Sequence, residues 1–428
     1  MQFFNSRMTL NTNAESARSG RKRIHVAVIG AGVRSASYLR NIPAALRDRV
    51  ELVAIADSSA SNRKLMKDRF AAGKTPAEFE DGADLLKSAT FDALIIGSYN
   101  NTHADFTISA LDTGASILLE KPVATTVEQC RRLWAKFQTV KDPQVFVGFV
   151  LRYTPFYQRI AKLLKEGSIG QLMAIDADEN ISQSITSAFY RGWRRDDDLS
   201  GGFMVEKCSH DFDIFSMLTG QKVQRVFSMA RRTHFIDRPR HEQHRRFDAS
   251  LIRNLALDYG DVHTKRIFEN TQDIPIYGAE SDVPDHQAVM MELEDGVLIN
   301  FMACLGQPRT TRRIKLFGSN GSVEGDIDRG FVFQEIPFEE KLGAQFEEHP
   351  IGSDDSGHHG ADSVINDAFW ASAAGMKSSN LAGVAEGIEA VLTGIAAEES
   401  KRTGLPVEVE PLRKAVYGSA STPLVATA

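Results

Sequence analysis

Short, continuous apolar runs recur through the first 150 residues of the chain, and each is followed by a turn and an amphipathic segment. These runs predict strands over 24–29, 51–56, 92–97, 115–120 and 144–149. Continuous apolar sequence, rather than alternation, is typical of parallel strands that are buried on both faces. The segments between the runs, such as 103–113 and 125–138, have the periodicity of helices. The alternation predicts a doubly wound α/β domain over residues 24–149.

After residue 150 the apolar positions alternate with polar ones. Pairs of alternating segments flank two turn dipeptides, Asp295-Gly296 and Asn320-Gly321, which predicts two hairpins. We therefore expect residues 150–410 to form an α+β domain with a large, mostly antiparallel open sheet.

Four segments fall outside this simple division. Residues 1–23 are polar and predict a disordered tail, and residues 411–428 predict a C-terminal tail. Residues 231–285 are rich in Arg, His and Asp and predict a polar insertion over the second sheet. The amphipathic helix expected over 382–402 is placed so that it could pack back on the first domain.

Composition narrows the class of protein. The chain has 428 residues, 42% of them hydrophobic and 25% charged, and a net charge of −6, which excludes the basic surface of a nucleic-acid-binding protein. No apolar run is long enough to span a bilayer, so we expect no membrane partner. The three cysteines are far apart and support neither a disulfide framework nor a metal site, which favours a reducing cytoplasm.

The first predicted strand runs into a glycine-rich turn that reads Gly30-Ala31-Gly32-Val33-Arg34-Ser35. In a G-x-G-x-x-G turn the first glycine permits the tight bend and the second lets a pyrophosphate approach the helix N-terminus. Ser35 replaces the third glycine with another small residue. We expect a dinucleotide here, with Gly30, Gly32, Val33 and Arg34 among its contacts.

Asp57 ends the second predicted strand, with Ser58 beside it. A carboxylate at this position can accept hydrogen bonds from the adenosine ribose and repel a 2′-phosphate, which favours NAD. Two alternatives stay open. Asp57 could instead cap a turn or helix, and the nearby cations Arg34, Arg63 and Lys64 leave NADP as a second choice.

Polar residues also follow the run 92–97, where Ser98, Asn100 and His103 would face the crevice in which ligands of such sheets bind. The same residues suit a turn and a helix N-cap equally well.

Glu120, Lys121 and Pro122 follow the buried run 115–120. A lysine here would be partly desolvated beside the nicotinamide, with Glu120 adjoining it. It could hydrogen-bond a substrate hydroxyl and stabilise the developing alkoxide.

Glu206 and His210 are four residues apart, and Asp213 lies three further on, which would place all three on one face of a helix. Histidine titrates near neutrality, so Glu206 and His210 form a plausible acid/base couple. A capped polar helix start is one alternative, and a metal site, for which two or three ligands are too few to argue, is another. His358 and His359 precede another predicted helix, where they would line a pocket or cap that helix.

Together these motifs resemble the glucose–fructose oxidoreductase / inositol dehydrogenase (Gfo/Idh/MocA) family over residues 24–410. The resemblance is carried by Gly30-Ala31-Gly32, by Asn100 and His103 as an N-x-x-H motif, by Glu120-Lys121-Pro122, by Gly201-Gly202, and by the stretch from Glu206 to Asp213. It implies a Rossmann domain that binds NAD, and a sugar, cyclitol or related polyol as the substrate. It also implies a homo-oligomer, a dimer or tetramer, built through the sheet of the second domain.

The same resemblance assigns roles. Lys121 would contact the reacting hydroxyl and His210 would accept or donate its proton, while Glu206 stands where the family usually has aspartate and Cys208 where it has glycine. The residues expected to shape the substrate pocket are Arg152, Tyr153, Tyr190, Trp193 and Asp213.

The function expected from the sequence is an NAD-dependent dehydrogenase that oxidises a secondary hydroxyl. Two alternatives remain. One is a redox-assisted NAD-dependent glycosidase or lyase on the same scaffold. The other is a cofactor-sensing regulatory protein, against which the presence of both Lys121 and His210 argues.

Overall fold

The computed structural model describes residues 22–236, 276–278, 280–337, 344–351, 360–377 and 381–418. The predicted tail up to residue 21, most of the predicted insertion 231–285, and His358 and His359 lie outside these residues. Lys22 and Arg23, assigned to the disordered tail from the sequence, instead pair with Asp92 and Glu51 and lead directly into the first strand.

The first sheet is parallel, with strand order β3-β2-β1-β4-β5-β6. Its strands are β1 (Ile24–Ile29), β2 (Val50–Ala56), β3 (Ala77–Phe79), β4 (Ala93–Ile96), β5 (Ser116–Leu119) and β6 (Val145–Val147). The strand order reverses between β1 and β4, which is where sheets of this type bind ligands. The sequence predicted every strand except β3, which is three residues long and too exposed to give an apolar run.

Helices follow the strands in the order expected of a doubly wound domain. They are α1 (Val33–Arg40), α3 (Ala60–Phe70), α4 (Gly82–Ser88), α5 (His103–Ala110) and α6 (Val127–Phe137). Pro43 separates α1 from the short α2 (Ala44–Arg47), because proline cannot supply the N–H that a continuing helix needs.

The second sheet has nine strands in the order β14-β13-β12-β11-β7-β10-β9-β8-β15. They are β7 (Leu172–Ser182), β8 (Val223–Arg231), β9 (His286–Leu293), β10 (Leu298–Gln307), β11 (Thr311–Gly318), β12 (Gly321–Asp326), β13 (Phe331–Pro337), β14 (Ala344–Pro350) and β15 (Val407–Glu408). All neighbours pair antiparallel except β7 and β10. Both predicted hairpins are confirmed, as β9–β10 and β11–β12.

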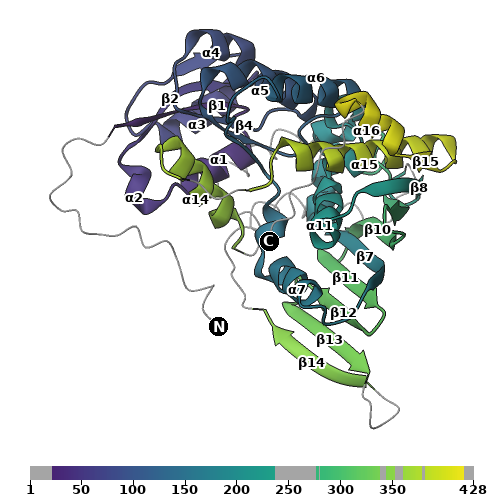
Figure 1. Ribbon diagram of the computed structural model, residues 1–428. Coiled ribbons are helices and arrows are strands. Elements are labelled where there is room, and N and C mark those ends of the chain that lie inside the picture. The colour runs from purple at the N-terminus through teal and green to yellow at the C-terminus, as the bar shows by residue number, and fades with distance from the viewer. Residues whose placement is uncertain are drawn as a thin grey trace.

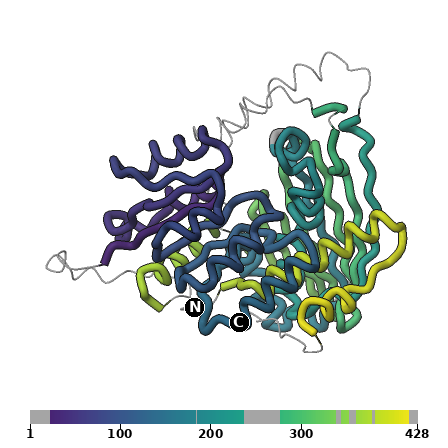
Figure 2. The backbone as a smooth tube through the Cα atoms, turned by 90° about the horizontal axis from the view of Figure 1, so that it is seen from above, coloured from purple at the N-terminus to yellow at the C-terminus, as the bar shows by residue number. Residues whose placement is uncertain are grey.

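Helices α7 (Pro155–Lys165), α11 (Ser209–Thr219) and α15 (Val384–Thr403) pack together on one face of this second sheet. The two sheets lie side by side. Helix α15 lies between the first domain and the second sheet, and α7 lies lower in Figure 1, along the second sheet (Figures 1 and 2). None of the helices in the described part of the chain has both the length and the apolar composition needed to cross a bilayer.

Two C-terminal helices return to the first domain. Helix α14 (Asp362–Ala373) buries Ile365, Phe369 and Trp370 in the same apolar cluster as residues of β1 and β4. Helix α16 (Glu410–Tyr417) packs on α6, and α15 also contacts α6 and β6. The sequence had assigned 362–373 to the second domain and residues from 411 onward to a tail, because neither helix shows in its own pattern which distant surface covers it (Figure 1).

Candidate active site

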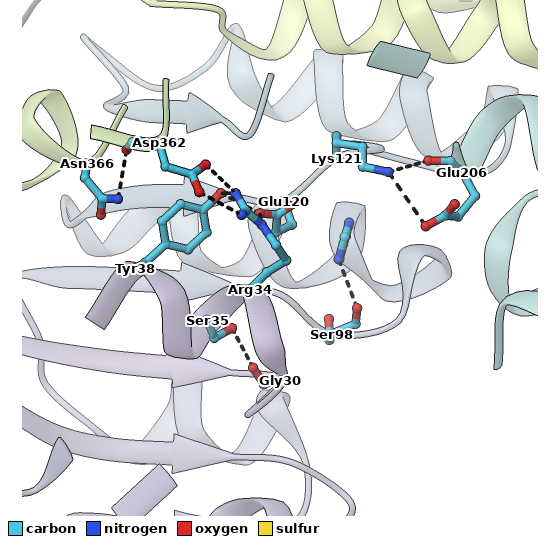
Figure 3. A network of polar contacts seen from close by, with 11 residues as sticks. Gly30, Arg34, Ser35, Tyr38, Ser98, Glu120, Lys121, Glu206, Asp362 and Asn366 are labelled. Atoms are coloured by element: carbon cyan, nitrogen blue, oxygen red, sulfur yellow. Dashed lines mark hydrogen bonds and ion pairs between the residues drawn. The ribbon is translucent and has the colours of Figure 1, made fainter. Parts of the chain in front are cut away.

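Gly30 allows the turn between β1 and α1 to pass close to β4. Its φ is +87°, and a Cβ atom built on it would lie 2.4 Å from the backbone of Gly97. Ser35 closes the turn from the other side, because its hydroxyl donates to the carbonyl of Gly30 at 2.6 Å (Figure 3). The serine at the third motif position therefore stabilises the turn as well as fitting its space.

The N-terminus of α1 fits the pyrophosphate of a dinucleotide. Gly32 is the N-cap residue, and no side chain caps the helix there. A Cβ atom at Gly32 would meet only the Gly97 carbonyl, at 3.8 Å, so the space beside the helix end is open. Helix N-termini with uncapped N–H groups attract anions, so this turn fits NAD.

Asp57 makes the contacts of a cap. One carboxylate oxygen accepts from the backbone N–H of Ala31 at 2.8 Å, and the other accepts from Ser59 at 2.8 Å. The side chain thus joins the end of β2 to the glycine turn. The oxygen that accepts from Ser59 also accepts from the Asn62 side chain at 3.4 Å. A carboxylate has about four acceptor sites, so these three bonds leave capacity for a ribose, and Ser58 beside it is exposed.

The cationic side chains that could bind the 2′-phosphate of NADP are paired with acidic side chains. Lys64 lies 2.6 Å from Asp68, and Arg63 lies within 3.8 Å of Glu78 and Glu80. Arg34 is likewise held by carboxylates, as described below. Their pairing weakens the case for a 2′-phosphate site and favours NAD.

His103 and Asn100 fix the loop at the end of β4. The two ring nitrogens of His103 face the carbonyl oxygens of Pro122, at 2.7 Å, and Ser98, at 3.2 Å, and burial lowers the pKa of this histidine. Asn100 donates to the carbonyl of Ser200 in the second domain at 2.9 Å. These contacts position the loop and its neighbour, and they correspond to the turn interpretation of the motif.

Glu120 is the centre of a buried polar network (Figure 3). It accepts hydrogen bonds from Arg34, at 2.8 Å, and from the Tyr38 hydroxyl. Arg34 also lies 3.3 Å from Asp362 of α14. Burial opposes ionisation of Glu120, but Arg34 and Tyr38 outweigh it and hold its pKa below the ordinary value. The guanidinium of Arg34, predicted to contact the cofactor, is therefore directed at two protein carboxylates.

Lys121 reaches from the first domain to the second. Its side chain is mostly buried, and its ammonium donates to the backbone carbonyl of Glu206 at 2.5 Å. The same nitrogen lies 3.7 Å from Oε1 of Glu206. Burial lowers the pKa of Lys121, with Lys207 and Arg194 adding to the effect and Glu206 opposing it.

Glu206 is held as a carboxylate. Arg194 donates its Nε to Glu206 Oε1 at 2.7 Å. Although burial favours the neutral acid, Lys121 and Arg194 together lower the Glu206 pKa to about 2. The other oxygen, Oε2, is buried and accepts from no group in the described residues. The sequence analysis missed Arg194, whose only signal was its place in the arginine-rich stretch beside Trp193.

The prediction that Glu206, His210 and Asp213 share one helix is wrong. Glu206 ends α10 (Phe203–Glu206), and α11 begins at Ser209. Lys207, between the two helices, is drawn to buried Glu179 at 2.8 Å, and the chain bends there. A spacing rule cannot reveal a break of this kind, at which the chain pairs with a strand residue nearly thirty positions away.

His210 and Asp213 do lie on α11, in different environments. The His210 ring is largely buried and meets Phe149 edge-on, with centroids 5.9 Å apart. Asp213 forms a buried two-bond ion pair with Arg152, at 2.8 and 2.5 Å. Both members of this pair were predicted to bind substrate, but their charged groups are occupied by each other.

The remaining predicted substrate residues also differ. Tyr153 accepts from the backbone N–H of Ala382 at 2.8 Å. Tyr190 is fully buried, its ring packs against Phe235, and its hydroxyl donates to the carbonyl of Val283 at 3.5 Å. Trp193 is partly exposed, and its ring lies 5.4 Å from that of Tyr99.

A buried cluster of charges lies beneath the site. Glu179, Cys208 and Asp211 have potential metal-ligand atoms within 4.8 Å of one another. However, Lys207 and Arg312 already pair with Glu179, and Arg312 also binds Asp211. The cluster is therefore an internal salt-bridge network that supports α11 from β7 and β11.

Two family descriptions match this chain. "Oxidoreductase family, NAD-binding Rossmann fold" matches residues 24–149, and "Oxidoreductase family, C-terminal alpha/beta domain" matches residues 161–409. The chain belongs to this family, Gfo/Idh/MocA, and is an oxidoreductase with an NAD-binding domain.

Individual relatives are more distant. YteT of Bacillus subtilis, whose name assigns it only to the oxidoreductases, is 22% identical over 386 residues, which cover 80% of this chain and 88% of YteT. Inositol 2-dehydrogenase 3 of Saccharopolyspora erythraea is 31% identical over 147 residues, 34% of this chain and 42% of that protein. This chain thus matches less than half of that dehydrogenase.

Solved structures share the fold. Scyllo-inositol dehydrogenase from Lactobacillus casei, solved with NAD(H) and scyllo-inositol, superposes with a TM-score of 0.63 at 17% identity, covering 91% of this chain and all of that one. An oxidoreductase domain protein from Kribbella flavida gives a TM-score of 0.67 at 20% identity, covering 91% and 99%.

Proposed function

We propose that this protein is an NAD-dependent dehydrogenase that oxidises a secondary hydroxyl of a sugar, cyclitol or related polyol, with Lys121 and His210 at the reacting oxygen. One observation carries the proposal: a desolvated lysine reaches across from the NAD-binding domain to a carboxylate of the second domain. The inositol dehydrogenases among the relatives support the substrate class.

In this proposal NAD supplies the hydride acceptor. The protein residues supply position and charge. Lys121 donates a hydrogen bond to the substrate oxygen and stabilises the negative charge that develops there. His210 takes the hydroxyl proton, so that the alcohol becomes a ketone as its hydride leaves. Glu206 orients Lys121 and, because its pKa is so low, acts as an acceptor rather than as the proton carrier.

The direct test follows NADH absorbance with a panel of sugars and cyclitols, chosen first by thermal shift in the presence of NAD. We expect Lys121→Ala and His210→Ala each to lower kcat about 10²-fold or more while the proteins still bind NAD. If both variants kept turnover within a few-fold of the wild type, the assignment of roles would be wrong.

The same experiment separates the alternatives. Bond cleavage in a glycoside without net NADH would indicate the redox-assisted glycosidase or lyase. Strong NAD binding with no turnover across the panel would indicate a regulatory protein.

We also propose that the protein is a homo-oligomer, a dimer or tetramer built through the open face of the nine-stranded sheet. The register places Met229, Met290, Leu298, Met302 and Phe317 on this one face, and each is 36 to 59% exposed. Adjacent apolar side chains exposed across several strands are typical of an interface with another protein. A second copy of the chain fits this face, since the polar side chains beside them are already paired, as in Arg313–Asp178 and Lys315–Glu324.

A further inference from the structure

Arg194 is held in one orientation next to the proposed reaction site. Its Nε donates to Glu206, and its guanidinium lies over the Trp193 ring, 4.7 Å from the centroid. The side chain is 34% exposed. Within the described residues, its two terminal nitrogens have no acceptor from the protein. The arginine therefore presents a fixed, open edge of two N–H groups.

The charges around Glu206 leave an excess of positive charge. Lys121 and Arg194 both contact the single Glu206 carboxylate, so this trio carries one net positive charge. The next cation, Lys207, is matched by Glu179. An anionic group on the substrate would balance the trio, and a planar arginine edge fits a carboxylate with two parallel hydrogen bonds.

Glu206 offers a second point of recognition. Its Oε2 is buried without a hydrogen-bond donor in the described part of the chain. A buried acceptor without a donor is costly, and a substrate hydroxyl would supply that donor. Glu206 thus offers an acceptor for a substrate hydroxyl, and Arg194 beside it offers two N–H donors for a substrate carboxylate.

An aromatic platform stands beside this pair. Trp193 comes from the second domain and Tyr99, 43% exposed, from the loop after β4 in the first domain. Flat aromatic faces suit the C–H faces of a sugar ring, and the Trp193 ring adjoins the Arg194 guanidinium.

We propose that the substrate is a sugar acid, a uronic or aldonic acid, and that Arg194 binds its carboxylate. The proposal rests on the proposed function for the location of the site. In this arrangement Arg194 determines specificity, Glu206 binds a hydroxyl, and Trp193 and Tyr99 support the ring.

The test uses matched pairs of probes that differ only at C6, namely D-galactose with D-galacturonate and D-glucose with D-glucuronate, together with D-gluconate. The full-length wild type is compared with Arg194→Met and with the conservative Arg194→Lys. Arg195→Met is the matched control. It removes the same charge one residue along, and the contacts of Arg195 to Ser281 and Asp282 use only its backbone carbonyl.

Two readouts are taken, namely kcat/KM for NADH formation and the thermal shift that each probe produces with NAD present. We expect the wild type to prefer the carboxylate member of a pair. Arg194→Met should lose about 10- to 100-fold in kcat/KM and most of the thermal shift for that member, because a charge-assisted hydrogen bond is removed. The neutral member should lose clearly less than the carboxylate member, because it has only the effect of Arg194 on Glu206 to lose. Arg194→Lys should retain part of the preference, and Arg195→Met all of it.

An equal loss for both members would show that Arg194 only positions Glu206, and it would overturn the proposal. A wild-type preference for the neutral sugars in both readouts would also overturn it. The outcomes separate this proposal from the proposed function. If a carboxylate probe binds in an Arg194-dependent manner without NADH formation, the sugar-acid proposal is supported and the proposed dehydrogenase function is contradicted. If only neutral sugars are turned over, the dehydrogenase function is supported and the sugar-acid proposal is contradicted.

Discussion

The ammonium of Lys121 lies 3.7 Å from Oε1 of Glu206, and the two residues belong to different domains. Glu206 is the strongest of the charges that oppose the lowering of the Lys121 pKa by burial. The protonation state of the proposed catalytic lysine therefore depends on how the second domain is placed against the first.

The pH profile should report this dependence. Lys121 must be protonated to donate to the substrate oxygen, and its pKa is below the ordinary lysine value, so activity should fall on the alkaline side as pH rises through that lowered pKa. Glu206→Gln removes the main opposing charge and lowers the pKa further. We expect the alkaline limb of kcat/KM to move toward lower pH by about one unit or more. Glu128→Gln, an exposed residue of α6, is the control, and an unmoved limb in Glu206→Gln would contradict the assignment.

The buried pair Arg152–Asp213 should matter for stability rather than for turnover. Both side chains are almost fully buried. Asp213→Ala leaves the guanidinium without its partner and should lower the free energy of unfolding by about 3–5 kcal/mol, measured by urea denaturation. Lys64→Met, which breaks an exposed pair with Asp68, should change it little. If Asp213→Ala kept full stability but raised KM, the residue would bind substrate as the sequence first indicated.

Two glycines with positive φ provide a matched test of the dinucleotide turn. Gly30 and Gly73 have φ of +87° and +80°, but a Cβ at Gly73 would meet no atom within 4 Å. Gly73→Ala should therefore cost only the backbone strain of about 1–2 kcal/mol. Gly30→Ala should in addition displace the turn from Gly97 and abolish the thermal shift produced by NAD. NAD binding that survives in Gly30→Ala would place the cofactor elsewhere.

Cofactor preference should depend on the charge of Asp57. Asp57→Asn keeps one acceptor for the Ala31 or Ser59 N–H but removes the charge that would repel a 2′-phosphate. We expect the ratio of kcat/KM for NAD over NADP to fall roughly tenfold or more. Asp68→Asn on the exposed side of α3 serves as the comparison. A ratio that stays constant would mean that Asp57 acts only as a cap.

The open sheet face should control the oligomeric state. Met290→Lys places a charge in the middle of the proposed interface, where desolvating it would be costly. Light scattering should show a shift of the wild-type oligomer toward monomer. Val364→Lys, an exposed apolar residue on α14, should leave the mass unchanged. A monomeric wild type would contradict the interface.

The sequence predicted most of the fold because buried parallel strands and alternating antiparallel strands leave different apolar patterns. It also singled out Lys121 and Glu206, which lie 3.7 Å apart in the structure, since strand ends and short motifs are visible locally. It failed where a distant group decides the local geometry. The helix breaks after Glu206, where Lys207 pairs with the distant Glu179, and Arg194 becomes part of the site through its contact with Glu206.

The position of helix α14 affects how the protein folds during synthesis and how it can be divided into fragments. The apolar cluster around β1 and β4 includes Phe369 and Trp370, so the nucleotide-binding unit is discontinuous along the chain. A fragment that ends near residue 149 would expose the surface that these rings cover. During synthesis, the N-terminal unit cannot complete its core until more than 370 residues have been translated, and chains stalled earlier would present that surface to chaperones and proteases.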